Sequence, residues 1–519
     1  MKKNISSLLI LLITSPVFAQ TTYNDIAPAL YNNCTSCHRP GGGAPFSMLS
    51  YNDISPWTTA IQTVLNNGDM PPWAADTSYL HFSNERFISQ ADRDTILAWI
   101  SDGALQGNPS LLPPPPNYPQ YQLNGTPDTI ISLPAFYSNA GANDAYNTFV
   151  IPLTLTQSRF IRAIELVPNN PALIHHAIIN ADTAGKVATD TSGNSYTILG
   201  DISIGTYAPG TRPVIFPGSA QLKMGVAIPA NAEFIMQIHT PAGTQGQPLS
   251  INVRLYFYNP GETGIRPVYN FVPLQYWEND FWIAPGTIKS FSTEQATFPY
   301  PISIYSAFPH SHQICTEILN FAYDTTTFDT TRLMKIDDWD FEHQEYYYYR
   351  NLVTIPTGYK FSSTHKYDNT SSNPNNPFSP PQLITGGLYS TDEMLFDGFQ
   401  FITYLPGDES INIDSILSTD SLLTVGIWEN YSAAATMNTS TVYPNPVSDR
   451  STITFSKKQS LSINAELRVW TIEGKAVNIA YQLKKNSIEI QKSNLKPNLY
   501  IYQIIDGSTK ISSGKFIVR

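Results

Sequence analysis

The sequence predicts a mainly β protein with one small helical domain near its N-terminus, and three observations support this class. Only 14% of the 519 residues are charged, whereas the chain holds 30 Tyr and many Thr, Ser and Asn. This composition is poor in helix-forming residues and rich in strand-forming ones. Short apolar runs separated by Pro, Gly, Asn and Asp recur through the centre and the end of the chain, which is typical of β-sandwiches. A helical pattern stands out only in the first hundred residues.

Residues 1–19 have the pattern of a secretory signal peptide. Lys2 and Lys3 supply positive charge, Leu8 to Ile13 an apolar stretch, and Val17-Phe18-Ala19 a cleavage site with a small final residue. The apolar stretch is too short to span a bilayer, and no later stretch approaches the roughly 18 apolar residues that a spanning helix needs. We expect export through the periplasm, with no transmembrane anchor.

Residues 20–107 form the predicted helical domain. The segment from Asp92 to Ile100 follows Ser89, a residue suited to the N-cap, and the pattern ends at Gly103. Residues 108–125 follow as a stiff extended linker, because four prolines, Pro113 to Pro116, stand in a row.

The remainder of the chain is predicted to be β-structure in two blocks. In the central block, about 126–430, strand-like runs are separated by turn residues, and in the last block, 442–519, apolar and polar residues alternate as in one small β-sandwich. Residues 432–441 are small, polar and uncharged, and we interpret them as a flexible linker. The central strand-like runs include Ala163–Val167, Phe234–Ile238, Ile251–Tyr258 and Gln400–Tyr404.

Charge and cysteine content exclude several classes of protein. A net charge of −11 without a basic run argues against nucleic acid and anionic membranes as partners. Three cysteines are too few for a disulfide scaffold, so rigidity must come from β cores or cofactors.

Cys34-Thr35-Ser36-Cys37-His38 is a C-x-x-C-H motif. Its two thiols can form thioethers to haem, and the histidine can ligate the iron. A redox C-x-x-C and a chance match are the alternatives, although no thioredoxin-like βαβ pattern surrounds the motif. The block from Cys34-Thr35-Ser36-Cys37-His38-Arg39-Pro40-Gly41-Gly42 to Met70-Pro71-Pro72-Trp73 resembles a cytochrome c domain. The resemblance implies haem c with Met70 as second axial ligand, and Met48 is the competing candidate.

Five of the other eight histidines fall into three patterns: the pair His175-His176, the lone His239, and His310-Ser311-His312. The H-x-H pair in an extended segment places both imidazoles on one face and suits a metal. Adjacent histidines converge only where the strand is twisted or bulged. A structural role remains the alternative for each pattern, and imidazole alone does not select among copper, iron, zinc and nickel.

The order of these histidines, followed by Met394, resembles the copper type II, ascorbate-dependent monooxygenase family, which includes peptidylglycine α-hydroxylating and dopamine β-monooxygenases. The resemblance spans about 300 residues and implies one copper at His175, His176 and His239, which relays electrons. It implies a second copper at His310, His312 and Met394, where O₂ and the substrate C–H bond react. It also implies two jelly-roll-like sandwiches, 126–275 and 276–431. Further matching segments are Pro168–Ala172, Tyr207–Gly210, Ile228–Ala232, Asp338–Phe341, Tyr367–Thr370 and Thr391–Met394.

The chain departs from this family at two points. Phe308 stands where the peptide-amidating members have a carboxylate-binding Arg, so a glycine-extended peptide is not the expected substrate. Cys315 is the one cysteine of this region, and we interpret it as a buried inert thiol, with a role near the copper as the alternative. His81, His343 and His365 are interpreted as non-ligands, the last two with a supporting role beside the metal as the alternative.

Val442-Tyr443-Pro444-Asn445-Pro446 and the terminal Phe516-Ile517-Val518-Arg519 resemble the sorting domain of the type IX secretion system. This resemblance implies the secretion machinery as partner and a secreted or surface-attached product. An ordinary carbohydrate- or protein-binding β module is the alternative.

Together these interpretations predict an exported haem–copper monooxygenase that hydroxylates a small molecule or peptide with O₂. Its electrons come from ascorbate or a redox protein and pass through the haem domain. The alternative is a surface protein that binds copper or haem without catalysis, or that only transfers electrons.

Overall fold

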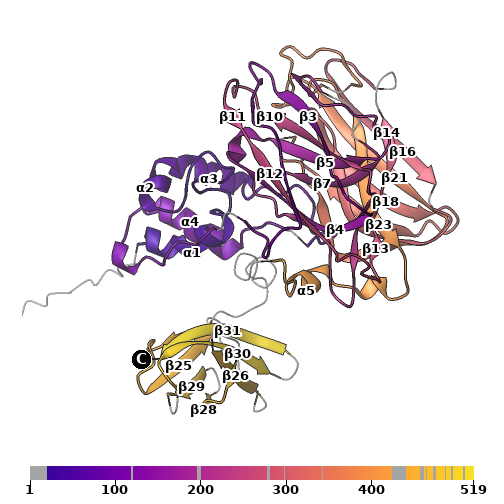
Figure 1. The fold of residues 1–519 in the computed structure, drawn as a ribbon. Helices are drawn as coiled ribbons and strands as arrows, with labels where there is room; N and C mark the ends of the chain where they lie inside the picture. The colour runs from indigo at the N-terminus through magenta and orange to yellow at the C-terminus, as the bar shows by residue number, and fades with distance from the viewer. Residues whose placement is uncertain are drawn as a thin grey trace, which may run out of the picture. The chain divides into compact units, whose positions relative to one another are not determined.

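The computed structural model describes residues 20–518 except 84, 119–120, 196–199, 277–280, 297, 342, 388, 424–439, 456–460, 463–464, 472–474, 485–486, 493–494 and 507–508. The predicted signal peptide, 1–19, and linker residues 432–439 lie outside the described residues. The chain divides into two compact units, Met1–Glu429 and Asn430–Arg519. The protein is mainly β, as predicted (Figure 1).

The first unit begins with a small helical segment. Its helices are α1 (Tyr23–Asn33), α2 (Tyr51–Ile54), α3 (Thr58–Asn67) and α4 (Gln90–Ser101). The side chain of Ser89 accepts a hydrogen bond from the Asp92 N–H, which confirms the predicted N-cap of α4. Buried side chains of α1 and α4, among them Tyr23, Leu30 and Trp99, form the core of this segment.

An arm formed by residues 73–86 leaves the helical segment and packs on the second β-sandwich described below. Phe82 forms a bridge with Tyr349 and stacks on its ring, with centroids 5.4 Å apart. Ala75 and Phe82 are buried in the core of that sandwich. The 20–107 block is therefore not an isolated domain held only by the Pro-rich linker, because this arm fixes it to the β-structure.

We expect Phe82→Ala to destabilise the first unit by about 3–5 kcal/mol, because the large side chain is 1% exposed and its loss leaves a cavity. Phe87→Ala is the matched control, since Phe87 is 43% exposed and its removal should cost little. Denaturant unfolding of both variants measures the difference. Equal stability of the two would show that the arm does not pack as described.

The first sandwich consists of two facing sheets (Figure 1). Its five-stranded sheet has the order β6 (Asp190–Gly193), β3 (Ala145–Pro152), β10 (Glu233–Thr240), β5 (His176–Asp182), β7 (Ile202–Tyr207). Its six-stranded sheet has β1 (Thr129–Ser132), β12 (Ile251–Phe257), β4 (Arg159–Pro168), β9 (Met224–Ile228) and β13 (Arg266–Pro267), with β8 (Val214–Ile215) paired to β4. A short ribbon joins β2 (Phe136–Tyr137) and β11 (Pro248–Leu249).

The second sandwich has two four-stranded sheets. One has the order β14 (Tyr269–Tyr276), β23 (Leu395–Thr403), β17 (Ile302–His310), β20 (Tyr347–Ile355). The other has β16 (Thr287–Ala296), β21 (Tyr359–Asn369), β18 (Cys315–Asp324) and β19 (Thr330–Ile336), and β15 (Trp282–Ile283) pairs with β22 (Ile384–Thr385). The short helix α5 (Ile413–Leu417) follows.

The predicted strands of the central block are confirmed within β4, β10, β12 and β23, but two expectations need correction. β14 pairs with β23, so the second sandwich begins at Tyr269 and not at residue 276. Helix is also not confined to the first block, because α5 lies near the end of the central one. The jelly-roll description stays a prediction.

The second sandwich has a core of its own, and some of its side chains also enter the core of the first. Tyr305, Phe308 and Tyr348 from the second sandwich are buried in the cluster that fills the first. This packing brings together strands that are far apart in the sequence.

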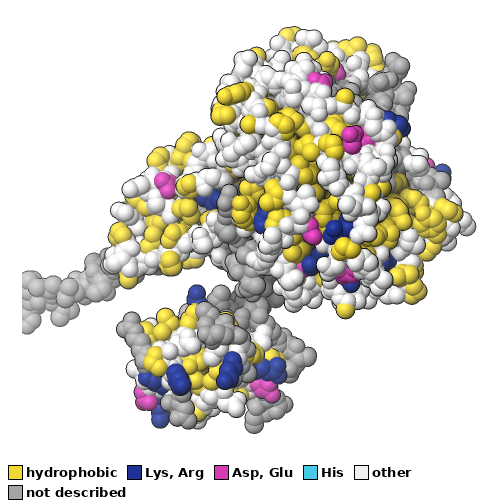
Figure 2. Space-filling view, in the orientation of Figure 1, with side chains coloured by type: hydrophobic (Ala, Val, Ile, Leu, Met, Phe, Trp, Pro, Cys, Tyr) yellow, Lys and Arg dark blue, Asp and Glu magenta, His cyan; other side chains and the backbone are white. Residues whose placement is uncertain are grey.

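The C-terminal unit is a separate β-sandwich, as predicted. Its sheets have the orders β24 (Ser440–Tyr443), β25 (Arg450–Phe455), β29 (Ser487–Gln491), β28 (Tyr481–Lys484), and β27 (Ala476–Val477), β26 (Ala465–Thr471), β30 (Asn498–Asp506), β31 (Thr509–Val518). Figure 2 shows Lys and Arg side chains spread over the visible face of this unit.

Candidate metal centre and haem cavity

His175, His176 and His239 meet at one end of the five-stranded sheet. His239 on β10 lies directly opposite His176 on β5. His175 precedes β5 and follows a 3-10 turn (Pro171–Leu173), so its backbone leaves regular strand geometry. This break supplies the irregular backbone that adjacent histidines need in order to converge.

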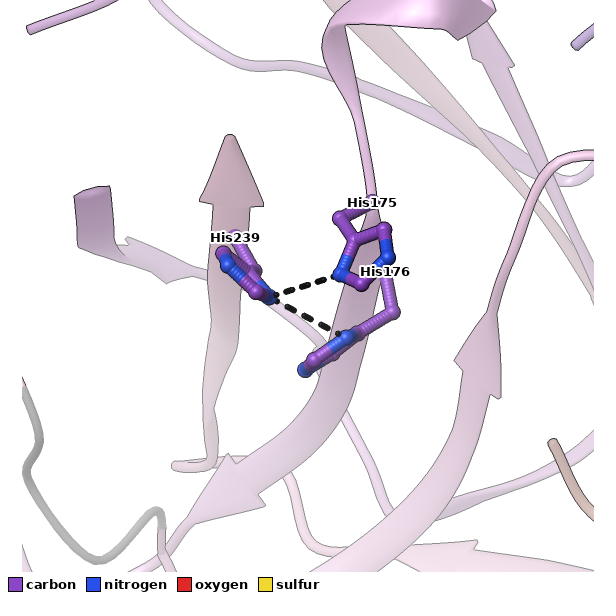
Figure 3. Close-up of side chains that lie close together, drawn as sticks. All are labelled: His175, His176 and His239. Carbon is purple, nitrogen blue, oxygen red and sulfur yellow. Dashed lines mark hydrogen bonds between the residues drawn. The ribbon is translucent and has the colours of Figure 1, made fainter. Parts of the chain in front are cut away.

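The three imidazoles present the same ring atom to one point. Nδ1 of His239 lies 3.2 Å from Nδ1 of His175 and 3.3 Å from Nδ1 of His176 (Figure 3). Three nitrogens at about 2.0–2.1 Å from one ion, at tetrahedral angles, stand about 3.3 Å apart. The donor set therefore fits a single metal ion.

Asp144 fixes the orientation of His239. Its carboxylate lies 2.9 Å from Nε2 of His239, which assigns the lone pair of that ring to Nδ1. Burial opposes the charged form of Asp144, but the hydrogen bond and nearby charge of His239 hold the pKa of Asp144 below its usual range. Burial and the neighbouring histidines lower the pKa of His176 well below its usual value, so this ring is in the neutral form that binds metals.

We expect Asp144→Asn to weaken metal binding at this triad about 10–100-fold, because second-layer partners of metal-bound histidines contribute on that scale. Copper titration of the purified chain, followed by absorbance or calorimetry, measures the affinity. Asp190→Asn on β6 of the same sheet is the control, since its carboxylate accepts from the Ser192 N–H and lies outside the triad. An unchanged affinity in Asp144→Asn would contradict this role.

His310 and His312 lie at the end of β17 and just beyond it. Their ring centroids are 5.2 Å apart, and both rings are held through Nδ1: His310 by the Gln344 side chain at 2.5 Å, and His312 by the Asp392 carbonyl at 3.0 Å. Their Nε2 atoms remain as the donors for a metal. Burial lowers the pKa of His310 to about 4 and that of His312 to about 3, so both rings are neutral near pH 7.

Met394 is brought to the same place. It is buried immediately before β23, and its carbonyl accepts hydrogen bonds from the hydroxyls of Ser311 at 2.7 Å and Tyr367 at 2.9 Å. Ser311 separates the two histidines in the chain, so the predicted ligand loops are adjacent in space.

A buried carboxyl group joins these loops. Glu393 accepts from the N–H groups of His312 at 2.9 Å, Ile314 at 2.8 Å and Met394 at 3.3 Å. Burial raises the pKa of Glu393 to about 8, although these backbone hydrogen bonds oppose the rise.

His365 and Asp397 form hydrogen bonds beneath the loop that carries Ser311, between His310 and His312. His365 is buried, with Nε2 at 3.0 Å from the Asp397 carboxylate and Nδ1 at 3.2 Å from the Ser311 hydroxyl. Its contacts agree with the supporting role considered for it in the sequence.

Phe341 lies between the two histidine sets. Its ring centroid is 6.2 Å from that of His175 and 6.1 Å from that of His312. The sum of these two distances is therefore the upper limit for the separation of the His175 and His312 rings.

The C-x-x-C-H motif lines a cavity of about 370 Å³ between the helical segment and residues Pro209, Gly210 and His343. Cys34, Cys37, His38, Met48 and Met70 all contribute to its wall. Nδ1 of His38 lies 3.1 Å from the Phe46 carbonyl, which leaves Nε2 as the donor for an iron. Met48 is buried and Met70 is 40% exposed, so Met70 as axial ligand stays a prediction.

Burial raises the pKa of Cys34 to about 12, with smaller contributions from Cys37 and Asp92. A redox-active C-x-x-C needs a lowered thiol pKa, so this environment disfavours the redox alternative. The apolar wall, two thiols and an oriented imidazole fit a covalently attached haem. Cys315 is free and buried, as predicted.

Comparison with known proteins identifies the end of the chain. Residues 441–519 match the secretion system C-terminal sorting domain. The predicted sorting domain is thereby confirmed, and it supports export and the type IX secretion machinery as partner. Among the described residues, no helix is long and apolar enough to cross a membrane. No curated protein matches the chain.

Matches to solved structures have low TM-scores. The glycosylasparaginase PNGase F from Flavobacterium meningosepticum is 12% identical, with 53% of this chain and 96% of that chain covered and a TM-score of 0.25. The CBM22 tandem domain of Paenibacillus barcinonensis Xyn10C is 10% identical, with 52% of this chain and 86% of that chain covered and a TM-score of 0.13. The VP2 subviral particle of infectious bursal disease virus is 13% identical, with 56% of this chain and 75% of that chain covered and a TM-score of 0.17. These scores are too low to assign a fold.

Proposed function

We propose that the protein is an exported haem–copper monooxygenase that hydroxylates a C–H bond of an organic substrate with O₂. The observation that carries this proposal is that two sets of partly or fully buried imidazoles, His175, His176 and His239 in one and His310 and His312 in the other, both lie near Phe341. A single structural metal would need only one of them.

In this proposal the first triad, His175, His176 and His239, holds one copper and relays electrons. His310, His312 and Met394 would hold the second, and two imidazoles with a thioether favour Cu(I), the oxidation state that can reduce O₂. When bound, copper supplies the one-electron chemistry that activates O₂. One oxygen atom enters the C–H bond and the other leaves as water, with two electrons and two protons consumed.

The chain's own side chains prepare this chemistry. Asp144, Gln344 and the Asp392 carbonyl orient the imidazoles before metal arrives, so little reorganisation is needed. Burial lowers the pKa of His310 and of His312, which keeps both rings in the neutral form that binds a metal.

The haem domain supplies electrons from an external donor, either ascorbate or a redox protein. The cavity at Cys34, Cys37 and His38 would hold haem c covalently, and passage through the periplasm provides the place for its attachment. The sorting domain then directs the loaded protein to the surface or the medium.

Isotope labelling tests the proposal even though the substrate is unidentified. Copper-loaded protein and Met394→Ile are incubated with a reductant, a metabolite extract and ¹⁸O₂, and products are profiled by mass spectrometry. We expect singly ¹⁸O-labelled products and O₂ uptake for the unmodified protein alone. Equal O₂ uptake by the two proteins would exclude the monooxygenase and favour non-catalytic metal binding.

A further inference from the structure

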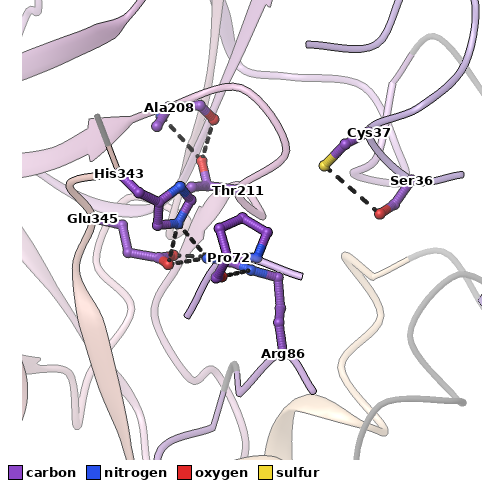
Figure 4. Close-up of polar contacts among 8 residues, drawn as sticks. All are labelled: Ser36, Cys37, Pro72, Arg86, Ala208, Thr211, His343 and Glu345. Carbon is purple, nitrogen blue, oxygen red and sulfur yellow. Dashed lines mark hydrogen bonds and ion pairs between the residues drawn. The ribbon is translucent and has the colours of Figure 1, made fainter. Parts of the chain in front are cut away.

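A cluster of charged and polar side chains closes the haem cavity on the side of the second sandwich. Arg86 and His343 both line this cavity. Arg86 pairs with Glu345 through both of its terminal nitrogens, and its Nη2 lies 2.5 Å from Nε2 of His343 (Figure 4). Nε of Arg86 donates to the Pro72 carbonyl at 3.1 Å, beside the predicted axial ligand Met70.

The charged side chains of this cluster are largely buried. The side chains of Arg86 and Glu345 are 14% and 3% exposed. Burial opposes ionisation of Glu345, but the Arg86 charge and the hydrogen bond with His343 hold its pKa below the usual range. A buried pair of this kind is costly to break, so it fixes the cavity wall relative to the sandwich.

The same stretch of chain reaches the metal centre. We define the bridging segment as Phe341, His343, Gln344 and Glu345. Gln344 follows His343 directly, and its side-chain oxygen holds Nδ1 of His310 at 2.5 Å. Phe341 lies beside His175 and His312. One short segment thus connects the haem cavity with both histidine sets.

We propose that Arg86 and His343 are positioning residues that hold the bridging segment against the haem cavity, and that electrons pass from haem to copper through this segment. The inference depends on the proposed function. In each transfer, ferrous haem becomes ferric and one Cu(II) becomes Cu(I), and the external donor re-reduces the haem. Two transfers supply one turnover.

A second contact between the helical segment and the sandwiches offers a longer route. A Cβ atom on Gly210 would stand 2.3 Å from Cys37 Sγ, so this loop approaches the motif closely. From Gly210 the path follows the chain back to Tyr207, crosses to Ala177 and only then reaches His176. The bridging segment runs two residues back along the chain from His343 to Phe341, whose ring centroid is 6.2 Å from that of His175 in the first triad, which favours it as the route.

Rapid mixing tests this route. Haem in the full chain is reduced without oxygen, the excess reductant is removed, Cu(II) is added to the copper-free protein, and haem oxidation is followed by absorbance. We expect His343→Leu and Arg86→Met to slow this oxidation at least about tenfold, because a small misplacement of reacting groups is costly. Arg86→Lys, which keeps the charge, should recover part of the rate.

Lys335→Met is the matched control. Lys335 pairs with Asp76 at 3.0 Å, which also joins the arm to the second sandwich, but neither residue lines the haem cavity. Its oxidation rate should stay within about twofold of the unmodified protein. Covalent haem content, bound copper and the rate of haem reduction by dithionite are measured for every variant, because a purely structural role would change those quantities too.

The outcomes separate this inference from the proposed function. If Cu(II) fails to oxidise haem in the unmodified protein, the relay itself is wrong and the inference falls with it. If the unmodified protein reacts and the His343 and Arg86 variants react equally fast, the relay stands and the bridging segment is not its route. Should Arg86→Met not fold, Arg86→Met combined with Glu345→Met removes both buried charges and takes its place.

Discussion

Replacing Cys34 and Cys37 with serine is expected to give a chain with no covalently bound haem. Serine hydroxyls do not form the thioether bonds by which a C-x-x-C-H motif holds haem. Both thiols line the same cavity as His38, so they lie where a haem edge would be attached. Haem-specific staining after denaturing electrophoresis measures the loss, because only covalent haem survives denaturation.

Cys315→Ser is the control for this prediction. Cys315 is free, buried in the core of the second sandwich and distant in sequence from the motif. Its variant should retain full haem staining when expressed with the machinery for haem attachment. Staining that survives in Cys34→Ser/Cys37→Ser, or an unmodified protein that never stains under these conditions, would contradict the haem assignment.

The haem motif and the histidine patterns could be found in the sequence because their spacing is local. C-x-x-C-H is contiguous, and H-x-H on a strand end places two imidazoles together without help from the rest of the fold. The N-cap of α4 was equally readable, since a serine three residues before Asp92 satisfies a free N–H group. His175, His176 and His239 could be assigned to one site only because the family resemblance groups these three histidines at a single metal.

The residues that orient these ligands carried no such signal. Asp144, Gln344 and Glu393 are single polar residues without a motif, and they become partners only through strand pairing across the sandwiches. Their common feature is burial of a polar side chain, which a sequence does not display. A search for Asp, Glu or Gln directly beside a predicted metal ligand would have found Glu393, which precedes Met394, but not Asp144.

The packing of the arm at residues 73–86 could not be predicted from the local sequence pattern. Its aromatic side chains complete the core of a sandwich that is formed by residues far along the chain. Tertiary packing of Trp73 and Phe82 with Tyr347 decides its position. The domain boundary was displaced for a related reason, because only the pairing of β14 with β23 assigns residues 269–276 to the second sandwich.

We expect His310→Ala to reduce bound copper from two ions to one per chain and to lower reductant-dependent O₂ uptake by at least about 100-fold. Loss of second-layer partners alone costs about 10–100-fold in affinity or activity, and removal of a ligand should exceed this. The first triad shares no ligand with His310, so its copper should remain. Metal analysis of the dialysed protein and an oxygen electrode measure the two quantities.

His81→Ala tests whether the effect is specific. The His81 side chain is 60% exposed and pairs with Glu85 on the arm, away from both histidine sets. It should keep both copper ions and full O₂ uptake. Two retained copper ions in His310→Ala would mean that this histidine is a structural residue held by Gln344, and the second copper would then have to be sought elsewhere.

The copper count and the O₂ uptake of His310→Ala answer different questions. Loss of one copper with unchanged O₂ uptake would make the first triad the site of oxygen chemistry and leave His310, His312 and Met394 as a binding site. Loss of both would show that the two sets depend on each other, as their shared contact with Phe341 allows. One combination of results agrees with the proposed roles, in which His175, His176 and His239 relay electrons and the second set reacts with O₂. In that combination, His310→Ala loses one of the two copper ions and also loses its O₂ uptake.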